Sequence, residues 1–313
     1  MAVSSNYSIG VDLGGTNLRA AAIDSLGNVI GKSSGHTDLQ DGRDAVIDDI
    51  VTAIRALRDQ FGQATLTGVG VAVPGFIDIK NGFIVGSNNL PQFDQFPVRD
   101  VISRHLGTPV ILENDANAAA MGEKWLGAGR DVNDLVLLTL GTGIGGGIIV
   151  NGCILHGFVG MAGEIGHMTV IPNGNPCGCG SQGCLEKNAS ATAIAAMARL
   201  LQLGESLTAK QVYELALGEG DQARRARQIF EAMGTALGIA IANLVNVFNA
   251  PLYLLSGGPL PAWDLFAPSM FRAVEKRSFT YRNTKTRIEK ATLGNEAGLY
   301  GAAYLPFLEA GKQ

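Results

Sequence analysis

The sequence has little charge and no long basic segment. Of its 313 residues, 17% are charged, with 24 Lys and Arg against 28 Asp and Glu, so the formal net charge is −4. Nucleic acids and anionic membranes are bound by clusters of Lys and Arg, and the sequence has no such cluster. We therefore expect neither a nucleic acid nor a membrane as partner, and an anionic ligand has to be held by local groups.

A secretion signal is also absent, because the first residues form neither a basic nor an apolar region. Two uncharged segments, 135–163 and 232–263, are long enough to span a bilayer. The first contains nine glycines and the second three asparagines and three prolines, which suit buried strands and turns better than a membrane helix. The sequence predicts a soluble, cytoplasmic protein.

Cysteine is scarce, but three of the four cysteines lie within eight residues, at Cys177, Cys179 and Cys184, and His167 lies ten residues upstream. In a cytosolic chain, cysteines at this spacing indicate a metal before a disulfide. One imidazole and three thiolates form a closed tetrahedral site of the kind that holds structural zinc. The fourth cysteine, Cys153, has apolar neighbours and is expected in the core.

Glycine is abundant, with 42 residues, roughly twice the average share of about 7%. One cluster, Gly14-Gly15, follows Asp12 and precedes Thr16 and Asn17, and a second is Gly141-Thr142-Gly143. Glycine turns expose backbone N–H groups that suit phosphate oxygens, although each is also a common hairpin turn. Two such loops facing each other would bind a polyphosphate, and Asp12 is a candidate metal ligand. They match neither a Walker A loop nor a Rossmann fingerprint, because a strand follows each turn.

The same order of elements occurs twice along the chain. Residues 9–24 read as a glycine-tipped hairpin, followed by a helix over 46–61, strands at 69–73 and 109–112, and a helix over 116–126. Residues 135–150 form a second such hairpin, followed by a helix over 232–248 and a strand at 252–255. We therefore expect an α/β protein with two similar domains and a cleft between them.

Asn114-Asp115 lies at the junction of a predicted strand and a predicted helix. Both residue types are favoured as helix N-caps. Ligands bind at the carboxyl ends of strands in open α/β sheets, where Asp115 would accept the proton of a substrate hydroxyl. The two roles are compatible.

Two glutamates flank the cysteine cluster. Glu164 comes three residues before His167, and Glu186 comes two residues after Cys184. Their uncharged surroundings indicate burial with a partner, and the paired hydroxyls of a sugar would serve. Because the glycine loops are distant in sequence, we expect loss of the metal to weaken binding of such a sugar much more than binding of a polyphosphate at the glycine loops.

Together these motifs resemble those of the ROK sugar kinases, in the same order and across nearly the whole chain. The matching segments are Asp12-x-Gly-Gly-Thr16, Glu113-Asn-Asp115, Gly141-Thr-Gly143, Ala162-Gly-Glu-x-Gly-His167 and the cysteine cluster ending in Glu186. The resemblance implies the hexokinase/actin-like ATPase fold and transfer of the γ-phosphoryl group of Mg-ATP to the 6-hydroxyl of a hexose. It also implies a small domain of residues 1–116 plus about 296–313 and a large domain of residues 117–295.

The resemblance assigns roles residue by residue. Asp115 is the general base. The sugar-binding residues are Gly75, Asn89, Asn114, Asp115, Glu164, His167 and Glu186. The ATP-binding residues are Asp12, Gly14, Gly15, Thr16, Asn17, Gly141, Thr142, Gly143, Gly257 and Gly258. Asp12 binds magnesium, and the zinc ligands are His167, Cys177, Cys179 and Cys184.

The sequence leaves alternatives open for the sugar and for the class of function. Asn89-Leu-Pro and Gly-Cys-Leu-Glu186 resemble the glucokinases more than the fructokinases, and N-acetylmannosamine or N-acetylglucosamine kinases are further alternatives. Other family members are sugar-sensing repressors with a helix-turn-helix before the first glycine loop. Only eight residues precede Ile9 here, so we expect the enzyme, and the family implies a homodimer.

Overall fold

The computed structural model describes residues 6–14, 17–36, 41–87 and 89–311. Gly15 and Thr16 of the first predicted phosphate loop lie outside these described residues. The strands are β1 (Tyr7–Leu13), β2 (Asn17–Asp24), β3 (Val29–His36), β4 (Leu66–Val73), β5 (Phe76–Asp78), β6 (Phe83–Gly86), β7 (Val110–Asn114), β8 (Leu135–Leu140), β9 (Ile144–Val150), β10 (Cys153–Ile154), β11 (Leu252–Gly257) and β12 (Arg287–Lys290). The α-helices are α1 (Arg43–Phe61), α2 (Val98–Leu106), α3 (Asp115–Trp125), α4 (Glu186–Ala189), α5 (Ala191–Leu200), α6 (Ala209–Ala216), α7 (Gly220–Phe248), α8 (Trp263–Arg277), α9 (Phe279–Asn283) and α10 (Ala297–Ala310).

The first sheet has the strand order β3-β2-β1-β4-β7. Strands β3, β2 and β1 are antiparallel neighbours, whereas β1, β4 and β7 run parallel. Every residue of the central strand β1 is buried, as expected for a strand covered on both faces. Ile9 and Val11 share an apolar core with Ile50 and Ile54 of α1, so α1 covers one face.

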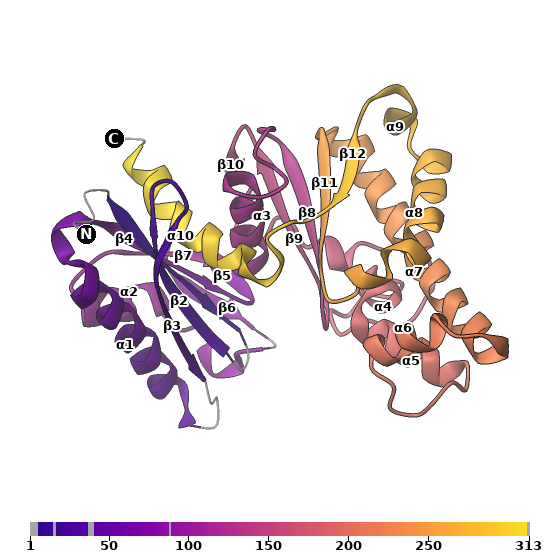
Figure 1. Ribbon diagram of the computed structural model, residues 1–313, viewed down its shortest axis with the longest axis horizontal. Coiled ribbons are helices and arrows are strands. Elements are labelled where there is room, and N and C mark those ends of the chain that lie inside the picture. The colour runs from indigo at the N-terminus through magenta and orange to yellow at the C-terminus, as the bar shows by residue number, and fades with distance from the viewer. Residues whose placement is uncertain (1–5, 15–16, 37–40, 88, 312–313) are drawn as a thin grey trace. The chain divides into compact units, whose positions relative to one another are not determined.

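The other face of the first sheet is covered by α10, at very short range. A Cβ at Gly10 in β1 would lie 2.4 Å from the Leu299 carbonyl oxygen, and one at Gly70 in β4 would lie 1.9 Å from that of Ala302. The backbone of α10 therefore lies directly on these two strands, which only glycine permits. The C-terminal helix, yellow in Figure 1, thus returns to the indigo N-terminal sheet.

The second sheet repeats the order of the first. Its strands are arranged β10-β9-β8-β11-β12, with β10 antiparallel to β9, and with β8, β11 and β12 parallel. Helices α7 and α8 pack against each other, and a Cβ at Gly234 in α7 would lie 2.1 Å from the Phe266 carbonyl oxygen. The duplicated plan expected from the sequence is present as two five-stranded sheets of equal strand order.

The chain forms two compact units with bounds that differ from the expected ones. The first comprises Met1–Asn133, Gly147–Gly163 and Thr292–Gln313, and the second Asp134–Gly146 and Glu164–Ala291. The sequence placed the boundary at residue 116, but α3 belongs to the first unit because it packs on α10. At that contact a Cβ on Gly122 would lie 2.1 Å from the Ala297 carbonyl oxygen.

Among the residues that the structure describes, one helix, α7, is long and apolar enough to cross a membrane, but 67% of its most apolar window is buried inside the protein. A core helix of a soluble protein passes the same test of length and composition.

The packing of α10 on β1 is testable by a pair of strand glycines. We expect Gly10→Ala to lower the free energy of unfolding by about 1–3 kcal/mol, because the added methyl overpacks against the α10 backbone. Gly35→Ala in β3 is the matched control, since its Cβ would lie 3.7 Å from Leu18, an ordinary contact. Equal midpoints of urea unfolding for the two variants would contradict this account.

Candidate functional site

The junction of β7 and α3 holds the predicted base in place. The Asn114 side-chain oxygen accepts hydrogen bonds from the backbone N–H groups of Ala116 (2.9 Å) and Asn117 (3.1 Å), so Asn114 is the N-cap of α3. Its amide nitrogen donates to the Gly75 carbonyl oxygen at 3.1 Å. Asp115 is the first helical residue, and its carboxylate accepts from the Ala116 N–H at 2.9 Å. The capping role expected at this junction therefore belongs to Asn114.

The pKa of the Asp115 carboxyl group is raised well above its ordinary value. Burial, reinforced by the negative charge of Asp12, raises its pKa to about 6. Asp12 lies at the end of β1, 9% exposed, where it forms an ion pair with Arg19. Burial raises the pKa of Asp12 as well, against the lowering effect of the Arg19 guanidinium. A carboxyl group whose pKa lies near neutral pH suits a general base.

A buried glutamate beside Asp115 was not assigned a role from the sequence. Glu113 is 2% exposed. One of its carboxylate oxygens accepts from the Asn114 N–H (2.9 Å) and the Asn117 side chain (3.0 Å), and the other lies 2.7 Å from Nε2 of His156. The available signal was a charged residue at the end of the apolar run Val110-Ile-Leu, which requires a partner when buried.

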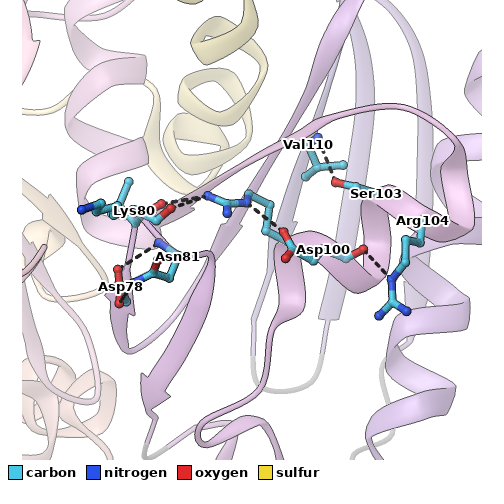
Figure 2. Close-up of polar contacts among 9 residues, drawn as sticks. Asp78, Lys80, Asn81, Asp100, Ser103, Arg104 and Val110 are labelled. Atoms are coloured by element: carbon cyan, nitrogen blue, oxygen red, sulfur yellow. Dashed lines mark hydrogen bonds and ion pairs between the residues drawn. The ribbon is translucent and has the colours of Figure 1, made fainter.

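Two predicted sugar-site residues, Gly75 and Asn89, bracket the β5–β6 hairpin. Gly75 has a φ of +120°, and a Cβ there would lie 2.7 Å from the Gly86 carbonyl oxygen, which favours glycine. Asn89 follows β6 and is exposed. The hairpin is held to α2 by Arg99, whose guanidinium donates to the carbonyl oxygens of Ile79 (3.0 Å) and Lys80 (3.2 Å). Figure 2 shows this network together with the Asp78–Asn81 hydrogen bonds of the turn.

In the second unit, two glycine turns follow neighbouring strands. The Gly141–Gly143 turn comes after β8 and is closed by a hydrogen bond from the Gly141 N–H to the Gly143 carbonyl oxygen, 2.9 Å. Gly257 ends β11, which is parallel to β8, and a Cβ on it would lie 2.0 Å from the Leu140 carbonyl oxygen. The predicted phosphate turn and the Gly257-Gly258 turn, which is also predicted to bind ATP, therefore lie at the carboxyl ends of adjacent parallel strands.

The four predicted zinc ligands come together. Their ligand atoms all lie within 4.8 Å of one another, with Cys177 Sγ 3.7 Å from His167 Nδ1 and Cys179 Sγ 3.7 Å from Cys184 Sγ. Tetrahedral zinc with Zn–S bonds of about 2.3 Å separates its sulfurs by about 3.8 Å, so the cluster fits zinc. The expectation that Cys153 lies in the core is wrong, because it sits on the two-residue strand β10 and is exposed.

The two glutamates beside the cluster differ in environment. The Glu164 side chain is 44% exposed and its carboxylate lies 3.9 Å from Nε2 of His167, so the side chain is only partly covered and the expected burial is wrong. Burial still raises the pKa of Glu164, His167 lowers it and the Glu186 charge raises it again. Glu186, at the start of α4, accepts a hydrogen bond from the Ile144 N–H at 3.1 Å. The sequence did not anticipate that Glu186 contacts the Gly141–Gly143 turn region.

The site residues thus fall into two groups. Within the described residues, the first unit holds Asp12, Gly14, Asn17, Gly75, Asn89, Asn114 and Asp115, and the second unit holds Gly141, Thr142, Gly143, Glu164, His167, Cys177, Cys179, Cys184, Glu186, Gly257 and Gly258.

The ROK family model matches residues 8–307. The chain belongs to the ROK family. A glucokinase from Halalkalibacterium halodurans is 38% identical over 97% of this chain and 96% of its own.

Solved ROK structures agree with this membership. A ROK hexokinase from Thermus thermophilus superposes with a TM-score of 0.87 at 31% identity, covering 97% of this chain and 99% of its own. A ROK family glucokinase from Streptomyces griseus, in complex with glucose and AMPPNP, has a TM-score of 0.78 at 31% identity, covering 96% and 99%. These relatives confirm the hexokinase/actin-like ATPase fold expected from the sequence.

The cysteine cluster predicts the metal content of the protein. We expect one zinc per chain in purified, reduced protein, measured by elemental analysis, and a strong loss of zinc in Cys184→Ser because a closed site needs all four ligands. Cys153→Ser, at the exposed cysteine outside the cluster, should keep its zinc. Active wild-type protein without zinc would contradict the site.

Proposed function

We propose that this protein transfers the γ-phosphoryl group of ATP to the 6-hydroxyl of glucose. The observation that carries the proposal is Asp115, fixed at the carboxyl end of β7 with a pKa raised to about 6. The family membership and the relatives named glucokinase support the reaction and the sugar. Their match over nearly their full length favours this enzyme over the sugar-sensing regulator.

In the reaction, Asp115 accepts the proton of the 6-hydroxyl while the hydroxyl oxygen bonds to the γ-phosphorus and the bond to the β-phosphate oxygen breaks. Glucose 6-phosphate and ADP are the products. Phosphoryl transfer depends mainly on positioning and charge stabilisation, so one base and well-placed donors suffice. Asn114, which caps α3 and contacts Gly75, keeps the Asp115 carboxylate oriented.

The other sugar hydroxyls are assigned to the second group of carboxylates. Glu164 and Glu186 accept hydrogen bonds from hydroxyls, and His167 contributes a ring nitrogen. Since Nδ1 of His167 faces Cys177 and Nε2 faces Glu164, zinc takes Nδ1 and leaves Nε2 for the sugar. Gly75 and Asn89 complete the assignment. The glucose-bound relative from Streptomyces griseus supports a hexose substrate.

ATP is assigned to the glycine turns. The phosphates are assigned to the first turn, residues 14–17, and to the second, Gly141 to Gly143, while the adenosine is assigned to Gly257-Gly258. Magnesium, when bound, neutralises phosphate charge. Asp12 is the ligand assigned to magnesium. Its buried carboxylate and that of Asp115 repel each other, and a cation bound by Asp12 would offset this repulsion. The AMPPNP-bound relative supports ATP as donor.

We also propose, as expected from the sequence, that the protein is a cytoplasmic homodimer without a nucleic acid partner.

Substitution of the base separates chemistry from binding. We expect Asp115→Asn to lower kcat by at least about 100-fold, within the ~10²–10⁴-fold range of general bases. It should leave the Kd for glucose within about tenfold. Steady-state ADP release measures kcat and calorimetry measures the Kd. In a separate assay of wild-type protein against glucose, fructose, N-acetylmannosamine and N-acetylglucosamine, glucose should be preferred. Asp115→Asn protein with more than about a tenth of wild-type kcat would refute the base.

The same variant should change how the stability of the protein depends on pH. Because the pKa of Asp115 is raised in the folded state, the folded protein binds its proton more tightly, and this group costs stability as the pH rises through about 6. We therefore expect Asp115→Asn to raise the Tm more at pH 8 than at pH 5. Asp59→Asn, at a side chain that is 76% exposed, should show no such difference.

A further inference from the structure

We infer that Glu186 is a positioning residue that couples sugar binding to nucleotide binding, because its carboxylate holds the turn assigned to the ATP phosphates. The inference rests on the proposed function. It concerns only the second unit, in which the turn, Glu186 and the cysteine cluster all lie.

The first contact is made by the Glu186 carboxylate. Its Oε2 accepts the hydrogen bond from the Ile144 N–H, directly after the Gly141–Gly143 turn. A Cβ on Gly143 would lie 2.3 Å from the same oxygen, so glycine at this position makes room for the carboxylate. Hydrogen bonds to charged groups are stronger than those between neutral groups, which makes Glu186 an effective anchor for the turn.

Two further hydrogen bonds come from the chain that follows Glu186. Helix α4 leads into α5, whose first residue, Ala191, donates its N–H to the Gly141 carbonyl oxygen at 2.8 Å. The Thr192 hydroxyl donates to the Thr142 carbonyl oxygen at 2.7 Å. One short segment, 186–192, therefore binds the turn at Gly141 and Thr142 and the backbone directly after it at Ile144.

The same segment is tied to the sugar-binding groups. Glu186 comes two residues after the cluster residue Cys184, and the Leu185 N–H donates to the Met168 carbonyl oxygen at 2.9 Å, beside His167. The negative charge of Glu186 also acts on Glu164. With Oε2 bound to the turn, the sugar hydroxyl is assigned to Oε1. A sugar that fixes this carboxylate thereby fixes the phosphate turn.

This arrangement revises the expectation that the metal cluster affects sugar binding much more than nucleotide binding. Coupling between two sites is reciprocal, so glucose must strengthen nucleotide binding by the factor with which nucleotide strengthens glucose binding. Couplings of this kind are usually about 5- to 150-fold.

The sharpest test places a methyl group between the turn and Glu186. Gly143→Ala should weaken glucose binding at least about fivefold without nucleotide present, because the methyl displaces the Glu186 carboxylate. Gly35→Ala, outside the assigned binding groups, is the control, since its Cβ would lie 3.7 Å from Leu18, and it should leave the Kd for glucose within about twofold. Calorimetry on the zinc-loaded protein measures both.

A second measurement reads the coupling itself. The Kd for glucose is measured with and without saturating AMPPNP, and wild-type protein should show at least about fivefold tighter binding with the nucleotide. Glu186→Gln and Thr192→Val should reduce this factor toward one. Glu164→Gln, whose carboxylate faces His167 instead of the turn, should weaken glucose binding but keep the factor.

The outcomes separate the inference from the proposed function. If wild-type protein binds neither glucose nor AMPPNP, both fail. If it binds both ligands, but the factor is one in wild-type protein or survives in Glu186→Gln, the proposed function stands and the coupling role of Glu186 is overturned.

Discussion

The arrangement of the first unit depends on backbones that approach each other without side chains between them. Gly10 and Gly70 let α10 lie directly on β1 and β4, and Gly122 lets α3 lie on α10. These contacts fix the ends of the parallel strands β1, β4 and β7 and the start of α3. Asp12 and Asp115 lie at those ends. The high pKa of Asp115, which follows from burial and then from repulsion by Asp12, is therefore a consequence of helix packing.

In both units, a buried or half-buried carboxylate fixes the functional backbone. Glu113 accepts hydrogen bonds from Asn114 and Asn117 and contacts His156. These contacts of Glu113 hold the end of β7, which Asp115 directly follows. Glu186 holds the backbone after the Gly141–Gly143 turn. Neither carboxylate is replaceable by an amide without loss, because an ionised oxygen accepts stronger hydrogen bonds than a neutral one. Rigid backbone at the reacting groups is what phosphoryl transfer requires.

The sequence predicted what depends on local pattern. The two glycine hairpins, helices α1 and α3, the C-terminal part of α7, the Asn114 cap and the cluster of His167 with three cysteines follow from periodicity, turn chemistry and ligand spacing. It did not predict contacts between distant segments: Glu113 and His156 are 43 residues apart, and Ile144 and Glu186 are 42 apart. The boundary between the units was missed for the same reason, since α3 is assigned by its packing on α10 at the far end of the chain.

The central claim is that Asp115 is a base whose pKa is set by burial and by Asp12. The pH dependence of kcat/KM for glucose tests it most directly, because this ratio reports on groups of the free enzyme. A base must be ionised, so kcat/KM should be constant above pH 7 and should fall about tenfold per pH unit below about 6. The Kd for glucose, measured over the same range, separates this loss from titration of the sugar-binding carboxylates. A kcat/KM that stays constant down to pH 5 would contradict the account.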